Sequence, residues 1–268
     1  MSRVDDLGAE LRAAARAGTP IPPLTAGHPD LTIAEAYAIQ RVGRRARLAE
    51  GATIVGHKIG LTSLAMQEML GVDQPDFGYL TADMISPSGA ALPAAAFIAP
   101  RAELEIAFRL REPLEGGALT AAEVLAATDA VAPAIEVIDS RIADWQLTIA
   151  DTVADNASSG HVVLGAWRDL DGLDLRALSG TLAVEGGAAE PTTVSGRGDA
   201  VLGDPAEAVA WLARALHEYG SERIDAGEIV LSGAMARALP VGPGSVARGQ
   251  IDQLGHVTST FTQGSGQW

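Results

Sequence analysis

The sequence predicts an α+β protein with a mainly β core and helices around it. From Thr53 onward, short β-branched runs alternate with turns marked by Gly and Pro. The first fifty residues instead carry apolar positions at helical spacing. No glycine-rich phosphate-binding loop follows a predicted strand, which disfavours a dinucleotide-binding fold. We therefore expect a helical N-terminal extension, residues 1–52, and a β-rich catalytic core, residues 53–268, that together form one functional unit.

Two helices are expected in the N-terminal extension. Apolar residues at helical spacing predict a helix over residues 3–17. Residues 18–30 are rich in Pro and Gly and are typical of a connector. Thr32 can cap a second helix because Glu35, three residues later, completes a capping box, and that helix should run to about residue 49.

The core is expected to alternate strands with a few helices. Asp204 is a natural N-cap for the helix that follows it, and Gly220 is a natural stop. The expected strands are Ile54–Ile59, Leu104–Leu110, Ala134–Ile138, Val162–Leu164, Leu182–Val184, Glu228–Leu231, Ser245–Ile251 and His256–Phe261. The expected helices are Ser63–Leu70, Ala121–Thr128 and Pro205–Tyr219.

Composition excludes several classes of function. Lys and Arg number 19 and Asp and Glu 34, which gives a net charge of −15. Such a chain repels phosphate, so we expect it to bind neither nucleic acid nor an anionic membrane. With no cysteine, disulfides, thiolate catalysis and iron–sulfur clusters are excluded. Neither a secretory signal nor a membrane span is present in the sequence, so the expected location is the cytoplasm.

The chain contains 18 arginines and a single lysine, Lys58. Chance survival of one lysine is the simpler interpretation. The functional interpretation is that Lys58 does something that arginine cannot. Arginine stays protonated at any working pH, whereas a desolvated lysine can exchange its proton and act as an acid or base.

Three glutamates occupy strands that are otherwise apolar. In the strand predicted around Leu104, Glu103 and Glu105 point to the same face, roughly 7 Å apart. That pattern alone is equally typical of an ordinary half-exposed strand. Glu136, however, lies in an apolar strand, where an ionised side chain is costly unless it is paired or bound to metal. Three carboxylates without cysteine favour Mg²⁺ or Mn²⁺ over zinc.

Other polar segments have simpler interpretations. Residues 139–141 directly follow the Glu136 strand. Residues 151–160 are dense in small polar groups, which usually satisfy their own backbone in a turn but could equally present hydroxyl and amide donors to an oxyanion. The segment 74–78 also reads as a turn, in which Asp76 is most simply a turn residue. The five histidines show no metal-binding spacing, and we interpret them as structural.

Five motifs, taken together and in this order, resemble those of the 2-keto-4-pentenoate hydratases. They are Gly56–Ser63, Gly71–Gly78, Glu103–Glu105, Glu136–Arg141 and Asp155–Ser158. That family includes the sister 4-oxalocrotonate decarboxylases and belongs to the fumarylacetoacetate hydrolase superfamily. The resemblance covers the chain from about residue 32 to its end. It implies a mixed β-sheet roll with a helical N-terminal extension, in a cytoplasmic homo-oligomer.

The resemblance also implies which residues form the site. Glu103, Glu105 and Glu136 match the acidic motifs that hold Mg²⁺ or Mn²⁺ in the family. These three positions are therefore expected to be the metal ligands of this chain.

Three further positions match residues of the family's active site. Lys58 matches its lysine, Asp76 matches the acidic residue of a PDFG turn, and Ser158 lies in the DNAS stretch. Ser159, beside it, could serve instead of Ser158. Lys58 and Asp76 are expected to carry the proton transfers, with burial lowering the pKa of Lys58 towards neutrality.

The implied activity is a metal-dependent hydratase of aromatic meta-cleavage catabolism. It would add water to 2-hydroxypenta-2,4-dienoate, the enol of 2-oxopent-4-enoate, or to a close homologue, giving a 4-hydroxy-2-oxo acid. Association with a pathway decarboxylase or aldolase is a further expectation.

Three alternatives stay open. Residues 71–78 are closer to the hydratases, but Ser159 stands where many hydratases have Cys, which reopens a decarboxylase acting on 2-oxohex-3-enedioate. A non-catalytic partner of such an enzyme would be expected to lack a metal carboxylate or the lysine, and this chain has all of them. A C–C hydrolase would need a His or Glu that activates water near the metal.

Arg101 and Arg141 could bind a substrate carboxylate or form structural ion pairs.

Overall fold

The computed structural model describes residues 2–63, 67–68, 72–188, 190–220 and 222–264. The helices are α1 Arg3–Ala17, α2 Leu24–Gly27, α3 Ile33–Ala49, α5 Ala121–Ala127, α6 Ile149–Ala154 and α7 Pro205–Gly220. The strands are β1 Ile54–Gly60, β2 Asp76–Thr81, β3 Ile85–Pro87, β4 Ala90–Pro93, β5 Arg101–Leu110, β6 Thr128–Ile138, β7 Ser159–Leu164, β8 Ser179–Gly186, β9 Thr192–Arg197, β10 Ile229–Ala234, β11 Leu239–Pro240, β12 Ser245–Ile251 and β13 Gly255–Thr262.

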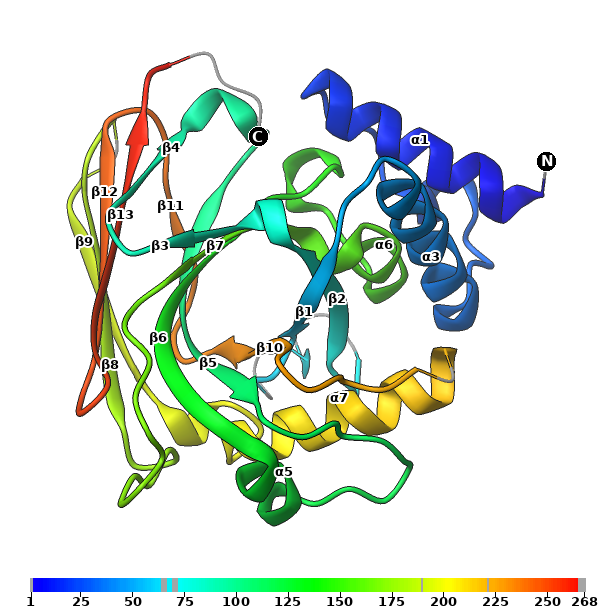
Figure 1. The fold of residues 1–268 in the computed structure, drawn as a ribbon. Helices are drawn as coiled ribbons and strands as arrows, with labels where there is room; N and C mark the ends of the chain where they lie inside the picture. The colour runs from blue at the N-terminus through cyan, green and yellow to red at the C-terminus, as the bar shows by residue number, and fades with distance from the viewer. Residues whose placement is uncertain (1, 64–66, 69–71, 189, 221, 265–268) are drawn as a thin grey trace.

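The two N-terminal helices form as the sequence predicts. Thr32 and Glu35 make the expected capping box at the start of α3. Helix α1 packs on α3, and α3 packs in turn on α6 (Figure 1). Tyr37 of α3 is buried and stacks on Phe77 of β2, with ring centroids 4.4 Å apart. The helices are therefore attached to the same strands that carry the site.

Two β-sheets build the rest of the molecule. The first, which is mixed, has the order β2-β1-β10-β5-β6-β7-β3, with β11 also pairing with β5. The second has the order β4-β13-β12-β8-β9 and packs against the β5–β6 part of the first. Figure 1 shows the first sheet curling between the second sheet and the N-terminal helices, with α7 below it. This arrangement confirms the predicted α+β fold.

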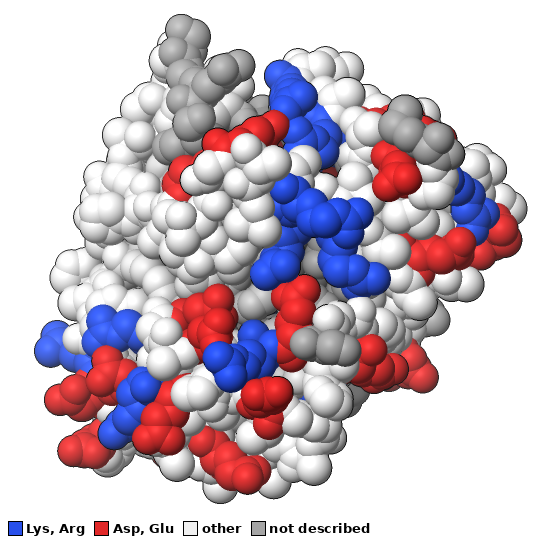
Figure 2. Space-filling view, turned by 45° about the vertical axis from the view of Figure 1, so that its right-hand side comes forward, with Lys and Arg blue, Asp and Glu red and all other residues white. Residues whose placement is uncertain are grey.

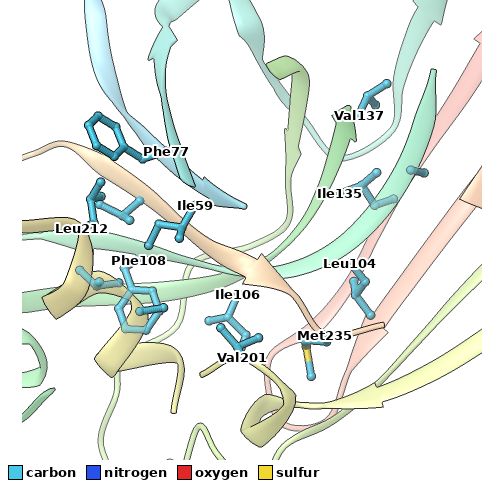
Figure 3. Packing of buried hydrophobic residues seen from close by; sticks show 14 of the residues in the cluster. Ile59, Phe77, Leu104, Ile106, Phe108, Ile135, Val137, Val201, Leu212 and Met235 are labelled. Carbon is cyan, nitrogen blue, oxygen red and sulfur yellow. The ribbon is translucent and has the colours of Figure 1, made fainter. Parts of the chain in front are cut away.

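One face of β5 fixes the orientation of the strand. Leu104, Ile106 and Phe108 are almost fully buried in the main apolar core (Figure 3). Burying each of these side chains contributes roughly 1.5–3 kcal/mol. Because neighbouring strand residues point to opposite faces, Glu103 and Glu105 are directed to the other side of the sheet.

The two central strands are longer than predicted. Strand β5 begins at Arg101 and β6 at Thr128, whereas the expected starts were 104 and 134. Proline lacks an N–H and interrupts most strands, but β6 continues through Pro133. In the structure Pro133 lies opposite Ile106, and its carbonyl accepts a hydrogen bond from the Gly165 N–H at 2.8 Å.

Several other elements differ from the expectation. Strands β2, β3, β4, β9 and β11 were not predicted. Strands β3, β4 and β11 are short, β9 is rich in small polar residues, and β2 begins in the segment that we interpret as a turn. Most of the helix expected over residues 63–70 lies outside the described residues.

Charged side chains on the N-terminal helices lie in mixed clusters. Figure 2 shows arginines gathered on this face with acidic residues beside them. Arg12 and Arg16 both contact Glu50, and Arg47 contacts Asp83. Among the described residues, no helix has the length and apolar character needed to cross a bilayer.

Candidate active site

Three carboxylates converge on the face of β5 and β6 opposite the core. Glu103 lies directly across from Glu136 in the antiparallel register, and Glu105 is two residues further along β5. One carboxylate oxygen from each residue lies within 4.8 Å of the others. Like charges directly opposite each other destabilise a strand pair. The negative charge of this cluster must be compensated by protonation, by the Lys58 ammonium or by a bound cation. Glu103 and Glu105 share one face of β5, as the sequence predicts.

The chemistry of these oxygens suits a hard divalent cation. Gly233 N–H donates to one oxygen of Glu105 at 2.8 Å. The other Glu105 oxygen and both Glu136 oxygens are buried without a hydrogen-bond partner in the described structure, and Oε1 of Glu136 has only an ion pair with Lys58. Burial and the neighbouring Glu136 raise the pKa of Glu103 to about 7, and the same two causes raise the pKa of Glu105 well above its usual value. Burial also raises the pKa of Glu136.

Lys58 extends into this carboxylate cluster from β1. Its side chain is buried, with Nζ 3.3 Å from Oε1 of Glu136, and it donates a hydrogen bond to the Ala157 carbonyl at 3.0 Å. Burial by itself lowers the pKa of Lys58, but the surrounding negative charge, led by Glu136 and Asp76, raises it by more. The expectation of a pKa near neutrality is therefore wrong for the metal-free chain, because it counted burial and not the charge.

Asp76 is the first residue of β2 and not part of a turn. Strand β2 pairs with β1 so that Asp76 faces Gly60. A Cβ at Gly60 would lie 2.3 Å from Oδ1 of Asp76 and 3.4 Å from Nζ of Lys58. Glycine there leaves space for both groups. Thr152 of α6 donates to Asp76 at 3.0 Å, and burial raises the pKa of Asp76.

The two candidate serines occupy different environments. Ser159 Oγ donates to the carbonyl of Asn156 at 2.7 Å. Ser158 is buried, and its Oγ has no hydrogen-bond partner in the described structure. Of the two hydroxyl groups, only that of Ser159 has a hydrogen-bond partner among the described residues.

The polar segments around Asp155 turn out to be a helix and a structural network. Residues 149–154 form α6, with Thr148 and Asp151 as its capping box. Arg141 is paired with Asp155, and its Nε lies 2.5 Å from Oδ1. Arg141 is therefore engaged in a structural ion pair. Arg101 instead lies over the Trp145 ring, 4.6 Å from its centroid.

Sequence reasoning missed the backbone groups that complete the site. The Ala157 carbonyl and the Gly233 N–H each contact a candidate functional side chain. Backbone groups carry no sequence signal. Thr152 could have been found, because it lies in the polar stretch that we noted.

The histidines stay outside the carboxylate cluster. His57 points to the opposite side of β1 from Lys58, where it is buried with Nε2 3.8 Å from Glu228. The ring of His161 lies 2.9 Å from the hydroxyl of Ser86. Of the two residue types that a C–C hydrolase could use to activate water, the described cluster contains glutamate and no histidine.

His57 should make the protein sensitive to acid. Burial and the nearby Arg44 lower its pKa to about 4, against 6.5 for an ordinary histidine. The unfolded chain protonates His57 below about pH 6.5, whereas the folded protein does so only near pH 4. The contribution of neutral His57 to stability is therefore complete above pH 6.5 and is lost as the pH falls through 4. Replacing His57 by Asn should remove on the order of 3 kcal/mol of the decline in unfolding free energy between pH 7 and pH 4.

Urea unfolding at both pH values measures this effect. His217→Asn, at an exposed position of α7, is the matched control and should leave the decline unchanged. An equal decline in wild type and His57→Asn would contradict the assignment.

Comparison with known proteins gives a consistent result. The chain is 45% identical over 263 residues to 2-hydroxyhexa-2,4-dienoate hydratase of Comamonas testosteroni, covering 97% of this chain and 98% of that protein. It is 42% identical to 2-keto-4-pentenoate hydratase of Paraburkholderia xenovorans (strain LB400), covering 96% and 94%. No protein-family model matches the chain.

The solved structures agree in fold. A 4-oxalocrotonate decarboxylase from Pseudomonas putida G7, complexed with magnesium and adipate, superimposes with a TM-score of 0.91 at 36% identity, covering 97% of this chain and 98% of that one. Hydratases at 40% identity and above thus match nearly the whole chain, as does the related decarboxylase at lower identity. The chain belongs to the 2-keto-4-pentenoate hydratase family, a group of hydro-lyases within the fumarylacetoacetate hydrolase superfamily.

Proposed function

We propose that this chain adds water to 2-hydroxypenta-2,4-dienoate or a close homologue and releases a 4-hydroxy-2-oxo acid. The observation that carries the proposal is the placement of three carboxylates beside the chain's only lysine on a buried face of the sheet. The named activities of its relatives support the same reaction.

Glu103, Glu105 and Glu136 would hold a divalent cation, which we propose is Mg²⁺ or Mn²⁺. Their oxygens lie within 4.8 Å of one another, and such hard ions prefer oxygen ligands. When bound, the cation supplies Lewis-acid polarisation of the substrate's carboxylate and adjacent oxygen. The related decarboxylase was solved with magnesium, which supports this choice.

Lys58 and Asp76 would divide the proton transfers. The first half-reaction moves a proton from the 2-hydroxyl group to carbon 5 and produces the 2-oxo-3-enoate. In the second, water adds its oxygen to carbon 4 and a proton reaches carbon 3. Lys58 Nζ lies 3.3 Å from Oε1 of Glu136 and donates a hydrogen bond to the Ala157 carbonyl, and we assign it the role of proton donor. Asp76 is held by Thr152 and accepts protons.

Ser158 would orient a reacting oxygen. Its hydroxyl is buried without a partner in the described structure, and an unpaired buried hydroxyl is costly unless a ligand completes it. Ser158 directly follows Ala157 in the chain, and the Ala157 carbonyl accepts the hydrogen bond of Lys58, the proposed proton donor.

Product analysis with Mg²⁺ tests the proposed reaction. With 2-hydroxypenta-2,4-dienoate we expect 4-hydroxy-2-oxopentanoate and no CO₂. The parallel substrate is 2-oxohex-3-enedioate. Release of CO₂ from it, with little hydration of the first substrate, would transfer the chain to the decarboxylase reaction, which its structural similarity to the Pseudomonas enzyme keeps as the second candidate. No reaction with either would favour a non-catalytic partner.

We also propose that the chain works as a homo-oligomer and associates with a pathway decarboxylase or aldolase. The family resemblance supports both. Sedimentation of the purified chain, alone and with each enzyme, would test them.

A further inference from the structure

An unusual turn carries two of the candidate catalytic contacts. Asn156, Ala157 and Ser158 all have left-handed backbone angles, with φ of 55°, 50° and 53°. For residues other than glycine this conformation costs roughly 1–2 kcal/mol each, and it persists only where the surroundings enforce it. We call these three residues the left-handed turn.

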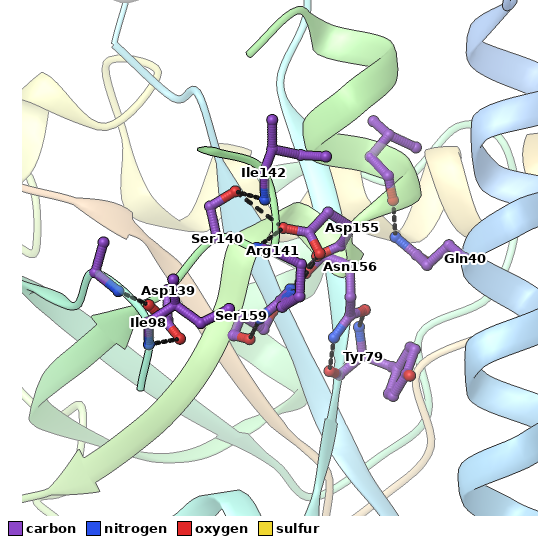
Figure 4. A network of polar contacts seen from close by, with 12 residues as sticks. Gln40, Tyr79, Ile98, Asp139, Ser140, Arg141, Ile142, Asp155, Asn156 and Ser159 are labelled. Atoms are coloured by element: carbon purple, nitrogen blue, oxygen red, sulfur yellow. Dashed lines mark hydrogen bonds and ion pairs between the residues drawn. The ribbon is translucent and has the colours of Figure 1, made fainter. Parts of the chain in front are cut away.

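Asn156 and Ser159 hold the two ends of the left-handed turn. The Asn156 side chain accepts from Tyr79 N–H at 2.9 Å and donates to the Tyr79 carbonyl at 3.0 Å, as a neighbouring strand would (Figure 4). Ser159 Oγ closes the turn on the Asn156 carbonyl. Gly78 allows this close approach, since a Cβ there would lie 2.4 Å from that same carbonyl oxygen.

Arg141 joins the residues on both sides of the left-handed turn. Its guanidinium pairs with the Asp155 carboxylate and donates to the carbonyl groups of Asp155 and Ser159 (Figure 4). Its backbone N–H also donates to Asp155, at 3.0 Å. The guanidinium thus spans the left-handed turn from its first flanking residue to its last.

The left-handed turn delivers two groups to the site. The Ala157 carbonyl accepts the hydrogen bond of Lys58 Nζ, and the unpaired Ser158 hydroxyl lies next to it in the chain. Lys58 is therefore held between the turn and Glu136. A small movement of the turn would change the position of both the proton donor and the hydroxyl group.

We propose that Arg141 is a positioning residue, which keeps the left-handed turn in place and through it sets Lys58 and Ser158. Arg141 does not touch the substrate in this scheme. The inference rests on the proposed function. It accounts for an arginine that the reaction itself does not use.

Arg141→Ala tests the inference in the Mg²⁺-loaded enzyme. Because misplacement by about 1 Å can cost roughly 10²-fold, we expect kcat to fall by about that factor while KM changes little. Added guanidinium chloride at non-denaturing concentration should restore part of the activity, and equal sodium chloride should not. Space for the added ion exists, because Arg141 lines a cavity of about 550 Å³ between the N-terminal helices and the left-handed turn.

The single lysine provides a readout that does not depend on turnover. Lysine labelled with ¹³C at Cε gives one side-chain signal, from Lys58 alone. We expect this signal to move in Arg141→Ala and to return with guanidinium. Arg109→Ala removes another arginine–aspartate pair, 2.6 Å from Asp129, and serves as the matched control.

The outcomes separate the two proposals. A wild-type enzyme that does not hydrate the dienoate contradicts the proposed function, whereas the lysine signal still decides the role of Arg141. An unchanged signal, or a kcat within about threefold of wild type, would overturn the inference. If Arg141→Ala does not fold, Arg141→Lys carries the test, because it keeps the charge but loses the planar group that reaches both carbonyls.

Discussion

Replacing Lys58 by Arg should reduce turnover by roughly 10³-fold or more, with the fold intact. General acid catalysis contributes about 10²–10⁴-fold. Arginine keeps the positive charge beside Glu136, 3.3 Å away in the wild type, but its guanidinium does not release a proton at working pH. The measurement is kcat for hydration at saturating Mg²⁺, together with the melting temperature.

Arg109→Lys is the matched exchange for this variant. It makes the reverse change between the same two residue types at a half-exposed position on β5, and it should retain wild-type turnover. If Lys58→Arg kept more than about a tenth of the wild-type kcat, the proton-transfer role would have to be abandoned.

Glu103→Gln should change stability in opposite directions with and without metal. Burial and Glu136 raise the pKa of Glu103 to about 7. Below pH 4.5 this carboxyl group is protonated in both the folded and the unfolded state and costs no stability. As the pH rises through 7, its ionisation destabilises the folded state. At pH 8 without metal, the neutral glutamine should therefore stabilise the fold by on the order of 1–2 kcal/mol.

With Mg²⁺ the wild type should instead be more stable than Glu103→Gln. A cation at 100 times its Kd stabilises the wild type by about 2.7 kcal/mol, and the variant, lacking one ligand, should gain much less and lose most of its turnover. Unfolding free energies of both proteins, measured once with EDTA and once with Mg²⁺, test the metal-free and the metal-loaded prediction. Glu112→Gln, at an exposed position just after β5, should follow the wild type. A variant with undiminished Mg²⁺ stabilisation would show that Glu103 is not a ligand.

The sequence alone predicted those features of the fold and the site that a short segment or the composition reveals. The capping box of Thr32 and Glu35, the shared face of Glu103 and Glu105, and the isolation of Lys58 were all visible in sequence. The first two depend on residues within a few positions of one another, and the third on the composition of the whole chain. The family resemblance then connected Lys58 to the glutamates, which the periodicity of single strands could not do.

The misses have a common physical cause. Pro133 and Gly78 are usually strand breakers, but here tertiary contacts favour them: the carbonyl of Pro133 bonds to Gly165, and Gly78 makes room for the left-handed turn. The pKa of Lys58 depends on carboxylates that come from other strands. The left-handed turn itself has no sequence signal at Ala157, because alanine does not favour that conformation.

The burial of Lys58 has a practical consequence for chemical modification. With its one lysine only 3% exposed and no cysteine in the chain, the folded surface offers amine- and thiol-directed reagents no side chain. Any lysine or cysteine introduced by mutagenesis would then be a unique attachment point, for a dye, a surface or a cross-linker to a neighbouring enzyme.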